Sequence, residues 1–191
     1  GLAIAEKAGL RAKELTPLLI TVAKRRYPVR KVTDLAPLLR EAAGLIPAGQ
    51  NIRVDYTIDP DLWPTEVDEA QIQQVLRHIV QNALEAMPAG GIIDVQAGNA
   101  IVEASDRLPI RDGRYVKISI RDHGQGIPEE LLSKIFDPYF TTKESRRGLG
   151  LAVSYAIIRN HEGLIRVESR EGQFSAFHIL LPAAPDEKGR S

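Results

Sequence analysis

Apolar residues recur along this chain with two periods, one typical of helices and the other of strands. Steps of three and four residues, the spacing of one buried helix face, mark the longest predicted helix, from Asp68 or Glu69 to about Met87. The Pro88–Gly91 segment ends that helix. Its buried face is expected to consist of Ile72, Val75, Leu76, Ile79, Val80, Ala83 and Leu84. The same approach predicts helices at residues 2–26, 35–44, 128–135 and 149–160.

Alternating apolar and polar side chains predict strands with one buried face. The clearest are residues 52–58 and 115–121, and the second of them places Asp122 at its end. Residues 98–113 carry little pattern and are expected to be a loop or a hairpin. Further strands are expected at 63–67, 92–97, 164–168 and 174–181. Strands and helices alternate through most of the chain, which favours an α/β domain.

The 191 residues have room for one domain of about 150 residues and an appendage. Residues 1–26 are expected to be that appendage, because one amphipathic helix interrupted by Pro17 cannot bury its own apolar face. We expect a linker at 27–31, the domain at 32–182 and a flexible polar tail at 183–191. The chain begins at Gly1 and its only methionine is Met87, so we expect a piece of a longer protein.

Composition narrows the possible function classes. Lysine plus arginine and aspartate plus glutamate are equal at 25 each, so the basic surface of a nucleic-acid-binding protein is not expected. The absence of cysteine excludes disulfides, thiolate catalysis and cysteine-based zinc sites. No apolar run approaches the ~20 residues that span a bilayer. The histidines lie in different predicted elements, which argues against a metal cluster; they are His78, His123, His161 and His178.

Two glycine pairs stand at the ends of predicted elements. Asp122 ends a strand and is followed by Gly124 and Gly126, whereas Gly148 and Gly150 open a helix. A carboxylate only accepts hydrogen bonds, so Asp122 suits the amino group of adenine and repels the carbonyl of guanine. The free N–H groups and the dipole of a helix start favour phosphate. Either pair alone is compatible with an ordinary turn, but the ordered set indicates a nucleotide pocket.

The long helix carries two polar residues one turn apart on the same face, His78 and Asn82. The amide oxygen of an asparagine suits Mg²⁺, which keeps several waters and bridges phosphates. Taken alone, Asn82 is better explained as a residue that faces solvent or caps a turn than as a metal ligand. His78 alone is better explained as a polar surface residue than as a base or a ligand. Just before the second glycine pair, Lys143, Arg146 and Arg147 either add positive charge against a triphosphate or lie in an exposed loop.

Two further patterns bear on alternatives. The chain has no Gly-x-x-x-x-Gly-Lys-[Ser/Thr] sequence, so a P-loop enzyme is not expected. His161-Glu162 looks like a phosphoacceptor pair of a histidine and an acid. Its place at a predicted helix C-terminus beside Gly163 instead favours a capping role.

The ordered set resembles the catalytic and ATP-binding domain of sensor histidine kinases, in the GHKL group of ATPases, over about residues 32–182. The segments that resemble the family's boxes follow one another in order: the N box at 68–87, the Asp-x-Gly-x-Gly box at 122–126, the F box at 136–140, the second glycine box at 148–151 and the last box at 172–177. The Phe-Asp-Pro-Tyr-Phe-Thr-Thr-Lys sequence is similar to kinases of the nitrogen-regulator type, which have short ATP lids.

This resemblance implies an α/β sandwich in which a mixed sheet is covered on one face by three helices. It implies ATP and Mg²⁺ as ligands, with Asn82 at the metal. It also implies a catalytic position for His78, which stands where many relatives carry Asn or Glu. The nucleotide-binding residues that it implies are Asn82, Asp122, Gly124, Gly126, Lys143, Arg147, Gly148, Leu149, Gly150 and Ser175.

The resemblance further implies a role in two-component signalling. The domain would transfer the γ-phosphoryl group of ATP to a histidine on a dimerisation helix outside this chain, for relay to a response regulator. Residues 2–26 are similar to the second helix of the family's dimerisation hairpin, so a homodimeric full-length protein with a cytoplasmic catalytic domain is expected. Its attachment to a membrane stays open. Two alternatives also stay open: an ATPase that couples nucleotide to conformational change, and an ATP-sensing or docking module that transfers nothing.

Overall fold

The computed structural model describes residues 28–142 and 148–185, and its centre is a five-stranded sheet in the order β2-β4-β5-β7-β6. β2 (Ile52–Ile58) runs parallel to β4 (Gly91–Val102), and the other neighbouring pairs are antiparallel, so the sheet is mixed. The remaining strands are β5 (Gly113–Asp122), β6 (Leu164–Arg170) and β7 (Phe174–Pro182). A separate small sheet pairs β1 (Lys31–Thr33) with β3 (Thr65–Val67).

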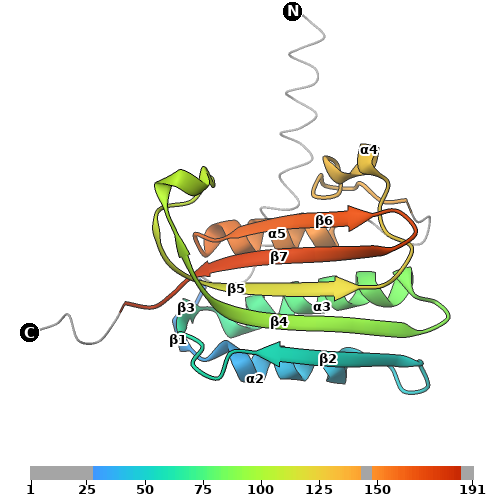
Figure 1. The fold of residues 1–191 in the computed structure, drawn as a ribbon, viewed down its shortest axis with the longest axis horizontal. Coiled ribbons are helices and arrows are strands. Elements are labelled where there is room, and N and C mark those ends of the chain that lie inside the picture. Colours follow the sequence, from blue (N-terminus) through green and yellow to red (C-terminus); the bar gives the residue numbers. More distant parts are fainter. Residues whose placement is uncertain (1–27, 143–147, 186–191) are drawn as a thin grey trace, which may run out of the picture.

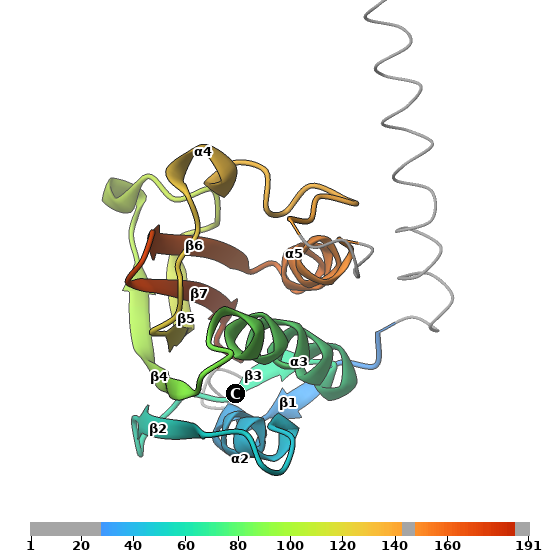
Figure 2. The same cartoon turned by 90° about the vertical axis from the view of Figure 1, so that its right-hand side faces the viewer.

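One face of the large sheet is covered by helices, as Figures 1 and 2 show. These are α2 (Leu35–Arg40), α3 (Glu69–Ala86) and α5 (Gly150–Asn160). A one-turn helix, α4 (Glu129–Leu132), follows β5, and 3₁₀ turns span Glu41–Leu45 and Ala104–Asp106. The predicted α/β sandwich, a mixed sheet with three helices on one face, is therefore confirmed for the described part of the chain.

The helix α3 has the start and the buried face that its sequence predicts. Asp68 caps it, because the Asp68 carboxylate accepts a hydrogen bond from the N–H of Gln71 at 3.2 Å. The predicted apolar face is buried except for Leu84, which is half-buried. The helix ends at Ala86, directly before Met87 and the Pro88–Gly91 turn.

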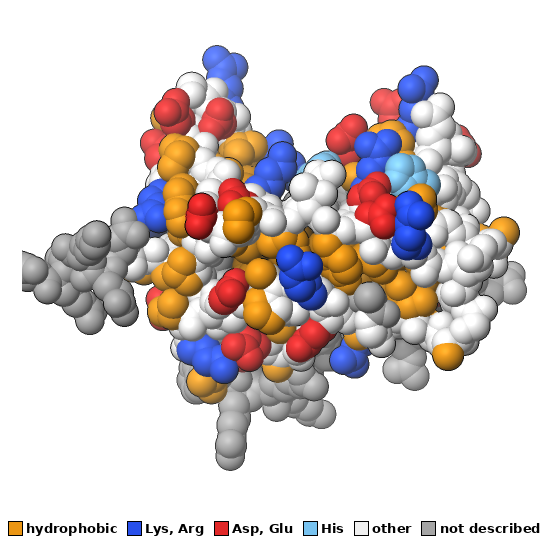
Figure 3. Space-filling view, turned by 60° about the horizontal axis from the view of Figure 1, so that its bottom comes forward, with side chains coloured by type: hydrophobic (Ala, Val, Ile, Leu, Met, Phe, Trp, Pro, Cys, Tyr) orange, Lys and Arg blue, Asp and Glu red, His pale blue; other side chains and the backbone are white. Residues whose placement is uncertain are grey.

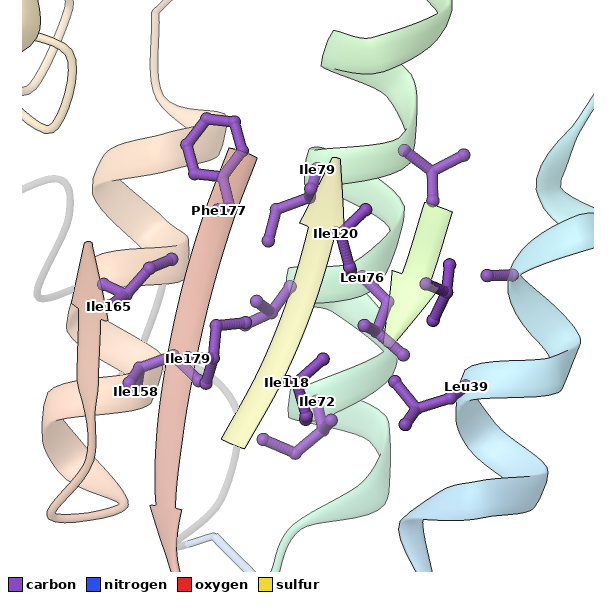
Figure 4. Close-up of a cluster of buried hydrophobic side chains, with 14 of the residues drawn as sticks. Leu39, Ile72, Leu76, Ile79, Ile118, Ile120, Ile158, Ile165, Phe177 and Ile179 are labelled. Atoms are coloured by element: carbon purple, nitrogen blue, oxygen red, sulfur yellow. The ribbon is translucent and has the colours of Figure 1, made fainter. Parts of the chain in front are cut away.

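The core fills the space between the sheet and the helices. Figure 4 shows Ile118 and Ile120 of β5 pointing towards Ile72, Leu76 and Ile79 of α3. Each of these five side chains is at most 2% exposed. Burying one such side chain contributes about 1.5–3 kcal/mol, so this layer fixes α3 against the sheet.

Several boundaries differ from the sequence-based expectation. β4 continues to Val102 and pairs with β5 through Gly113, so part of the segment 98–113 is strand rather than loop. Small and polar residues in this segment obscure the alternation of apolar and polar side chains that predicts a strand. The backbone is a strand there because its hydrogen bonds are made with β5. β1 lies partly within the predicted linker. The predicted tail begins with packed residues, because the N–H of Ala184 donates to the Pro64 carbonyl at 2.7 Å.

Some expectations lie outside the described residues. These are the helix predicted at 2–26 and the basic residues Lys143, Arg146 and Arg147. In the ranges that are described, no helix combines the length and the apolar character needed to cross a bilayer. Figure 3 shows acidic and basic side chains interspersed on the face turned to the viewer, with apolar side chains between them.

Candidate functional site

A cavity of about 880 Å³ opens where the C-terminal half of α3, the loop after β5 and the start of α5 meet. Most of the described candidates from the sequence line it together. These are His78, Asn82, Asp122, Gly126, Gly148, Leu149, Gly150 and Ser175. They come from α3, the end of β5, the start of α5 and β7, so the fold assembles one pocket from segments almost 100 residues apart.

Asp122 is the buried acid of this cavity. It is the last residue of β5 and only 4% of it is exposed. Burial raises the pKa of its carboxyl group from the ordinary 3.8 to about 6, and hydrogen bonds from backbone N–H groups, including that of Gly124 at 3.0 Å, partly oppose that shift. An ionised carboxylate in this place accepts hydrogen bonds and repels acceptors, so it selects a ligand with an N–H donor.

Ser175 is the neighbour of Asp122 across the sheet, in the register between β5 and β7. Only 4% of Ser175 is exposed, and its hydroxyl lies 3.0 Å from the hydroxyl of Ser169. The Ser169 hydroxyl also accepts a hydrogen bond from the N–H of Ile127 at 2.8 Å, in the loop after β5. These contacts tie the wall of the cavity at β7 to the loop that carries Gly126.

The two glycines after Asp122 have different places. Gly126 lines the cavity with a φ of +68°, and a Cβ there would lie 2.2 Å from the Arg170 carbonyl oxygen. Gly124 is outside the lining, and a Cβ there would lie 2.5 Å from the Ala86 carbonyl oxygen at the end of α3. Gly124 therefore permits the close approach of α3 to this loop, and a direct contact with nucleotide stays a prediction.

The start of α5 forms another wall of the cavity. Gly148 has a φ of +63°, and a Cβ on it would lie 2.5 Å from the Phe140 carbonyl oxygen, so only glycine fits this turn into the helix. The N-cap residue, Leu149, gives no side-chain hydrogen bond to the helix. The first N–H groups of α5 therefore lack a capping side chain, which is the arrangement that binds phosphate or another anion.

His78 and Asn82 both line the cavity from α3, as the helical spacing predicts. The Nδ1 atom of His78 lies 3.2 Å from the hydroxyl oxygen of Ser154 in α5. The ring also lies against the first turn of α5, since a Cβ on Gly150 would be 3.4 Å from its Cδ2 atom. The histidine is thus held between two helices rather than projecting into solvent.

Sequence reasoning missed several lining residues. Gln81 and Glu85 line the cavity and follow His78 and Asn82 by three residues, so helical spacing alone could have found them. The sequence around Phe177 and the other apolar residues of the wall indicates only that these side chains are buried in the hydrophobic core. Thr141 and Thr142 directly follow the predicted F box at 136–140 and also line the cavity, but their sequence gives no sign of it.

Two remaining predictions concern residues outside the lining of the cavity. His161 caps the C-terminus of α5, where its Nδ1 atom lies 2.8 Å from the Ile157 carbonyl oxygen, so its predicted capping role is confirmed. Its Nε2 atom accepts a hydrogen bond from the N–H of Asp68 at 3.1 Å. No group of three or more His, Cys, Asp or Glu side chains among the described residues could hold a metal ion.

Comparison with known proteins identifies the family of this chain. Residues 67–185 match the family described as "Histidine kinase-, DNA gyrase B-, and HSP90-like ATPase". The chain is 36% identical over 185 residues to the sensor kinase CckA of Brucella abortus, which covers 93% of this chain. It is 38% identical over 170 residues to the signal transduction histidine-protein kinase AtoS of Escherichia coli, which covers 87% of this chain. The chain spans 20% and 26% of the lengths of these two relatives.

A solved histidine kinase structure is also similar to this chain over nearly the whole length of that structure. The catalytic domain of the histidine kinase ThkA is 33% identical to this chain with a TM-score of 0.67. The alignment covers 81% of this chain and 95% of that domain.

Proposed function

The chain belongs to the family of histidine kinase-, DNA gyrase B- and HSP90-like ATPases, as an ATP-binding catalytic domain of the sensor histidine kinase type. We propose that it transfers the γ-phosphoryl group of ATP to a histidine outside this chain. One observation carries the proposal. A single cavity is lined both by a buried carboxylate and by an uncapped helix start that glycines open.

In this proposal Asp122 reads the base and α5 holds the phosphates. The Asp122 carboxylate accepts a hydrogen bond from the exocyclic amino group of adenine, and the carbonyl of guanine in the same place is repelled. The N–H groups after Gly148 and Gly150 donate to phosphate oxygens, assisted by the dipole of α5. Lys143 and Arg147, which lie outside the described residues, add positive charge.

The donor set of the cavity fits Mg²⁺ bound together with a nucleotide. The cavity offers the amide oxygen of Asn82, and Mg²⁺ in nucleotide sites commonly takes one or two protein oxygens and completes its shell with phosphates and waters. The metal would neutralise phosphate charge during transfer. The residues of the chain contribute mainly by fixing the nucleotide in position, because phosphoryl transfer depends on alignment and charge stabilisation.

The wider signalling role belongs to the same proposal. The acceptor histidine lies on a dimerisation helix of the intact protein, which acts as a homodimer and relays the phosphoryl group to a response-regulator receiver domain. Because ATP is supplied in the cytoplasm, the proposal places this domain there.

Titration calorimetry and a transfer assay test the proposal. We expect ATP with Mg²⁺ to bind and GTP to bind at least about 100-fold more weakly, because GTP presents an acceptor to Asp122. We also expect labelled phosphate to pass from [γ-³²P]ATP to an added dimerisation and phosphoacceptor domain. No binding of ATP would contradict the nucleotide site. Steady phosphate release without an acceptor would instead favour an ATPase coupled to conformational change, and binding without transfer would favour an ATP-sensing module.

A further inference from the structure

Ser169, in β6, fastens the loop after β5 to the start of β7. The N–H of Ile127, in that loop, donates a hydrogen bond to the Ser169 hydroxyl oxygen at 2.8 Å. The Ser169 hydroxyl in turn donates to the carbonyl of Phe174, the first residue of β7, at 2.7 Å. It also lies 3.0 Å from the hydroxyl of Ser175. Figure 1 shows the end of β5 and the turn between β6 and β7 at the same end of the sheet, where this one side chain connects them.

The two segments that Ser169 connects are also the two that hold the carboxylate of Asp122. The Oδ1 atom of Asp122 accepts a hydrogen bond from the N–H of Gly124, in the loop, at 3.0 Å. The carboxylate also accepts a hydrogen bond from the backbone N–H of Ser175, in β7. Hydrogen bonds are directional, so the orientation of a carboxylate between two donors depends on where the donors lie relative to each other. Ser169 restrains the loop relative to β7 and so restrains that orientation.

Ser169 acts through its neighbours, because it is outside the lining of the cavity, whereas Asp122, Ile127 and Ser175 line it. The loop also has contacts that do not involve the serine. The N–H of Gln125 donates to the carbonyl of Ala86, the last residue of α3, at 3.2 Å. Removing the Ser169 hydroxyl should therefore loosen the end of the loop at Ile127 without unfolding the loop.

We propose that Ser169 is a positioning residue for base selection, whose hydroxyl holds the loop and β7 so that the Asp122 carboxylate is aimed at the amino group of adenine. The proposal rests on the proposed function for the identity of the ligand. A carboxylate that is poorly oriented loses part of a directional hydrogen bond, whereas apolar contacts with the rest of the base depend much less on its orientation. The hydroxyl therefore matters for a ligand with the amino group and much less for the same ligand without it.

A cycle of one change in the protein and one change in the ligand tests this role. ATP is compared with purine riboside triphosphate, which lacks only the exocyclic amino group. We expect calorimetry with Mg²⁺ to show that Ser169→Ala weakens the binding of ATP by about five- to tenfold and that of the analogue by less than about twofold. Ser169→Cys, whose sulfur is only a weak acceptor, should show the same selective loss. Equal weakening of the two ligands, as a merely structural serine would give, or unchanged ATP affinity in both variants, would overturn the proposal.

The fastening of the loop can be measured on the protein without nucleotide. We expect the amide hydrogen of Ile127 to exchange with solvent about tenfold faster in Ser169→Ala than in the wild-type chain, because its acceptor is lost. The amide of Gln125 should keep its protection, since its acceptor is the Ala86 carbonyl. Hydrogen exchange followed by NMR measures both amides. An unchanged exchange rate at Ile127 would show that Ser169 does not hold the loop.

The matched control is Ser119→Ala, which removes a serine hydroxyl from β5 three residues before Asp122, and so on the opposite face of the sheet. It should leave the ratio of the two affinities and the exchange at Ile127 unchanged. The proposed function and the role of Ser169 fail separately. If the wild-type chain does not bind ATP, the proposed function is wrong, while the exchange at Ile127 still decides whether Ser169 holds the loop. If ATP binds but its preference over the analogue does not depend on Ser169, only the positioning role is wrong.

Discussion

Burial of Asp122 has opposite effects on stability and on binding. The side chain is ionised above its raised pKa of about 6, and in that state its charge is poorly solvated in the ligand-free protein. In the unfolded chain the carboxyl group titrates at its ordinary value of 3.8. The folded state therefore binds a proton more readily, and this group's contribution to stability declines as the pH rises from about 4 to about 6. Above about pH 6 the destabilisation of the folded state by the buried charge of Asp122 no longer changes with pH.

The first prediction concerns Asp122→Asn. Removing the buried charge should raise the free energy of unfolding of the ligand-free chain at pH 7 by about 1–2 kcal/mol. The same change should weaken ATP binding by more than about 1.5 kcal/mol, because a charge-assisted hydrogen bond to adenine is lost. Urea denaturation and titration calorimetry measure the two quantities. A variant that loses stability but keeps its ATP affinity would contradict the assignment of Asp122 to the base.

The second prediction follows from the same carboxyl group. The ionised carboxylate is a stronger acceptor for the adenine amino group than the protonated acid, so ATP affinity should fall as the pH is lowered through about 6. Below that value the fall should be at most about tenfold per pH unit. Calorimetry between about pH 5 and 8 measures the dependence. Asp122→Asn is the matched control, because its residual affinity should lack this step.

At the scale of elements, the cavity depends on close approaches between backbones. Gly126 in the loop after β5 and the turn between β6 and β7 lie against each other, and the N–H of Gly172 donates to the Gln125 carbonyl at 2.6 Å. A side chain at Gly126 would meet the Arg170 carbonyl, so this loop cannot retreat without opening the turn.

A pair of glycine variants separates this packing from conformational strain alone. Both Gly126 and Gly172 have positive φ, +68° and +74°, but a Cβ on Gly172 meets nothing within 4 Å. Gly172→Ala should therefore cost only the strain of a left-handed residue, about 1–2 kcal/mol. Gly126→Ala should cost about 3–4 kcal/mol, because a steric clash with backbone is added. Thermal or urea denaturation measures both, and equal losses would show that the close approach does not matter.

His161 connects the end of α5 to the start of α3. The side chain is 3% exposed, and its ring accepts from the N–H of Asp68 while its other nitrogen lies at the Ile157 carbonyl. Because Nε2 accepts, the native state requires the neutral ring, and burial lowers the pKa of His161 below its ordinary 6.5. As the pH falls through 6.5 the unfolded chain takes up a proton first, so this group's contribution to stability is lost on acidification.

The corresponding prediction is that His161→Ala lowers the free energy of unfolding at pH 7.5 by about 2–3 kcal/mol, since two buried hydrogen bonds are lost. His123→Ala is the control, because the side chains of His123 and its partner Asp94 are partly exposed, at 45% and 31%, and such surface pairs contribute about 1 kcal/mol or less. Urea denaturation measures both variants. Similar losses at the two histidines would argue against a special role for the buried one.

The sequence predicted those elements whose signal is local. The apolar face of α3 and the alternation of β5 lie within single segments, so the helix, the strand and the place of Asp122 were predicted correctly. β1 was missed because three residues are too few to show alternation. Ser154 was not singled out, since its partner His78 lies 76 residues away in the sequence and a small residue in an apolar helix looks like core. A contact between two helices that are distant in the sequence cannot be predicted from the residue pattern of either helix alone.

At the scale of the whole molecule, the last described residues close the domain. The N–H of Ala183 donates to the Arg114 carbonyl at 2.9 Å, and Ala184 is 7% exposed. We predict that deleting residues 183–191 lowers the free energy of unfolding by about 1–3 kcal/mol relative to deleting only residues 186–191. Urea denaturation of the two truncated chains measures the difference, and it isolates the three residues 183–185. Equal stability would show that the domain ends at Pro182.

β3 lies between both ends of this domain. It pairs with β1 along one side, and Thr65 bridges to Ala183 near the other end of the chain. The polypeptide therefore enters and leaves at neighbouring points, as it does in units that tolerate insertion into other proteins. Such a unit behaves as a cassette, because its first and last described segments meet at β3 although 157 positions separate residues 28 and 185 along the chain.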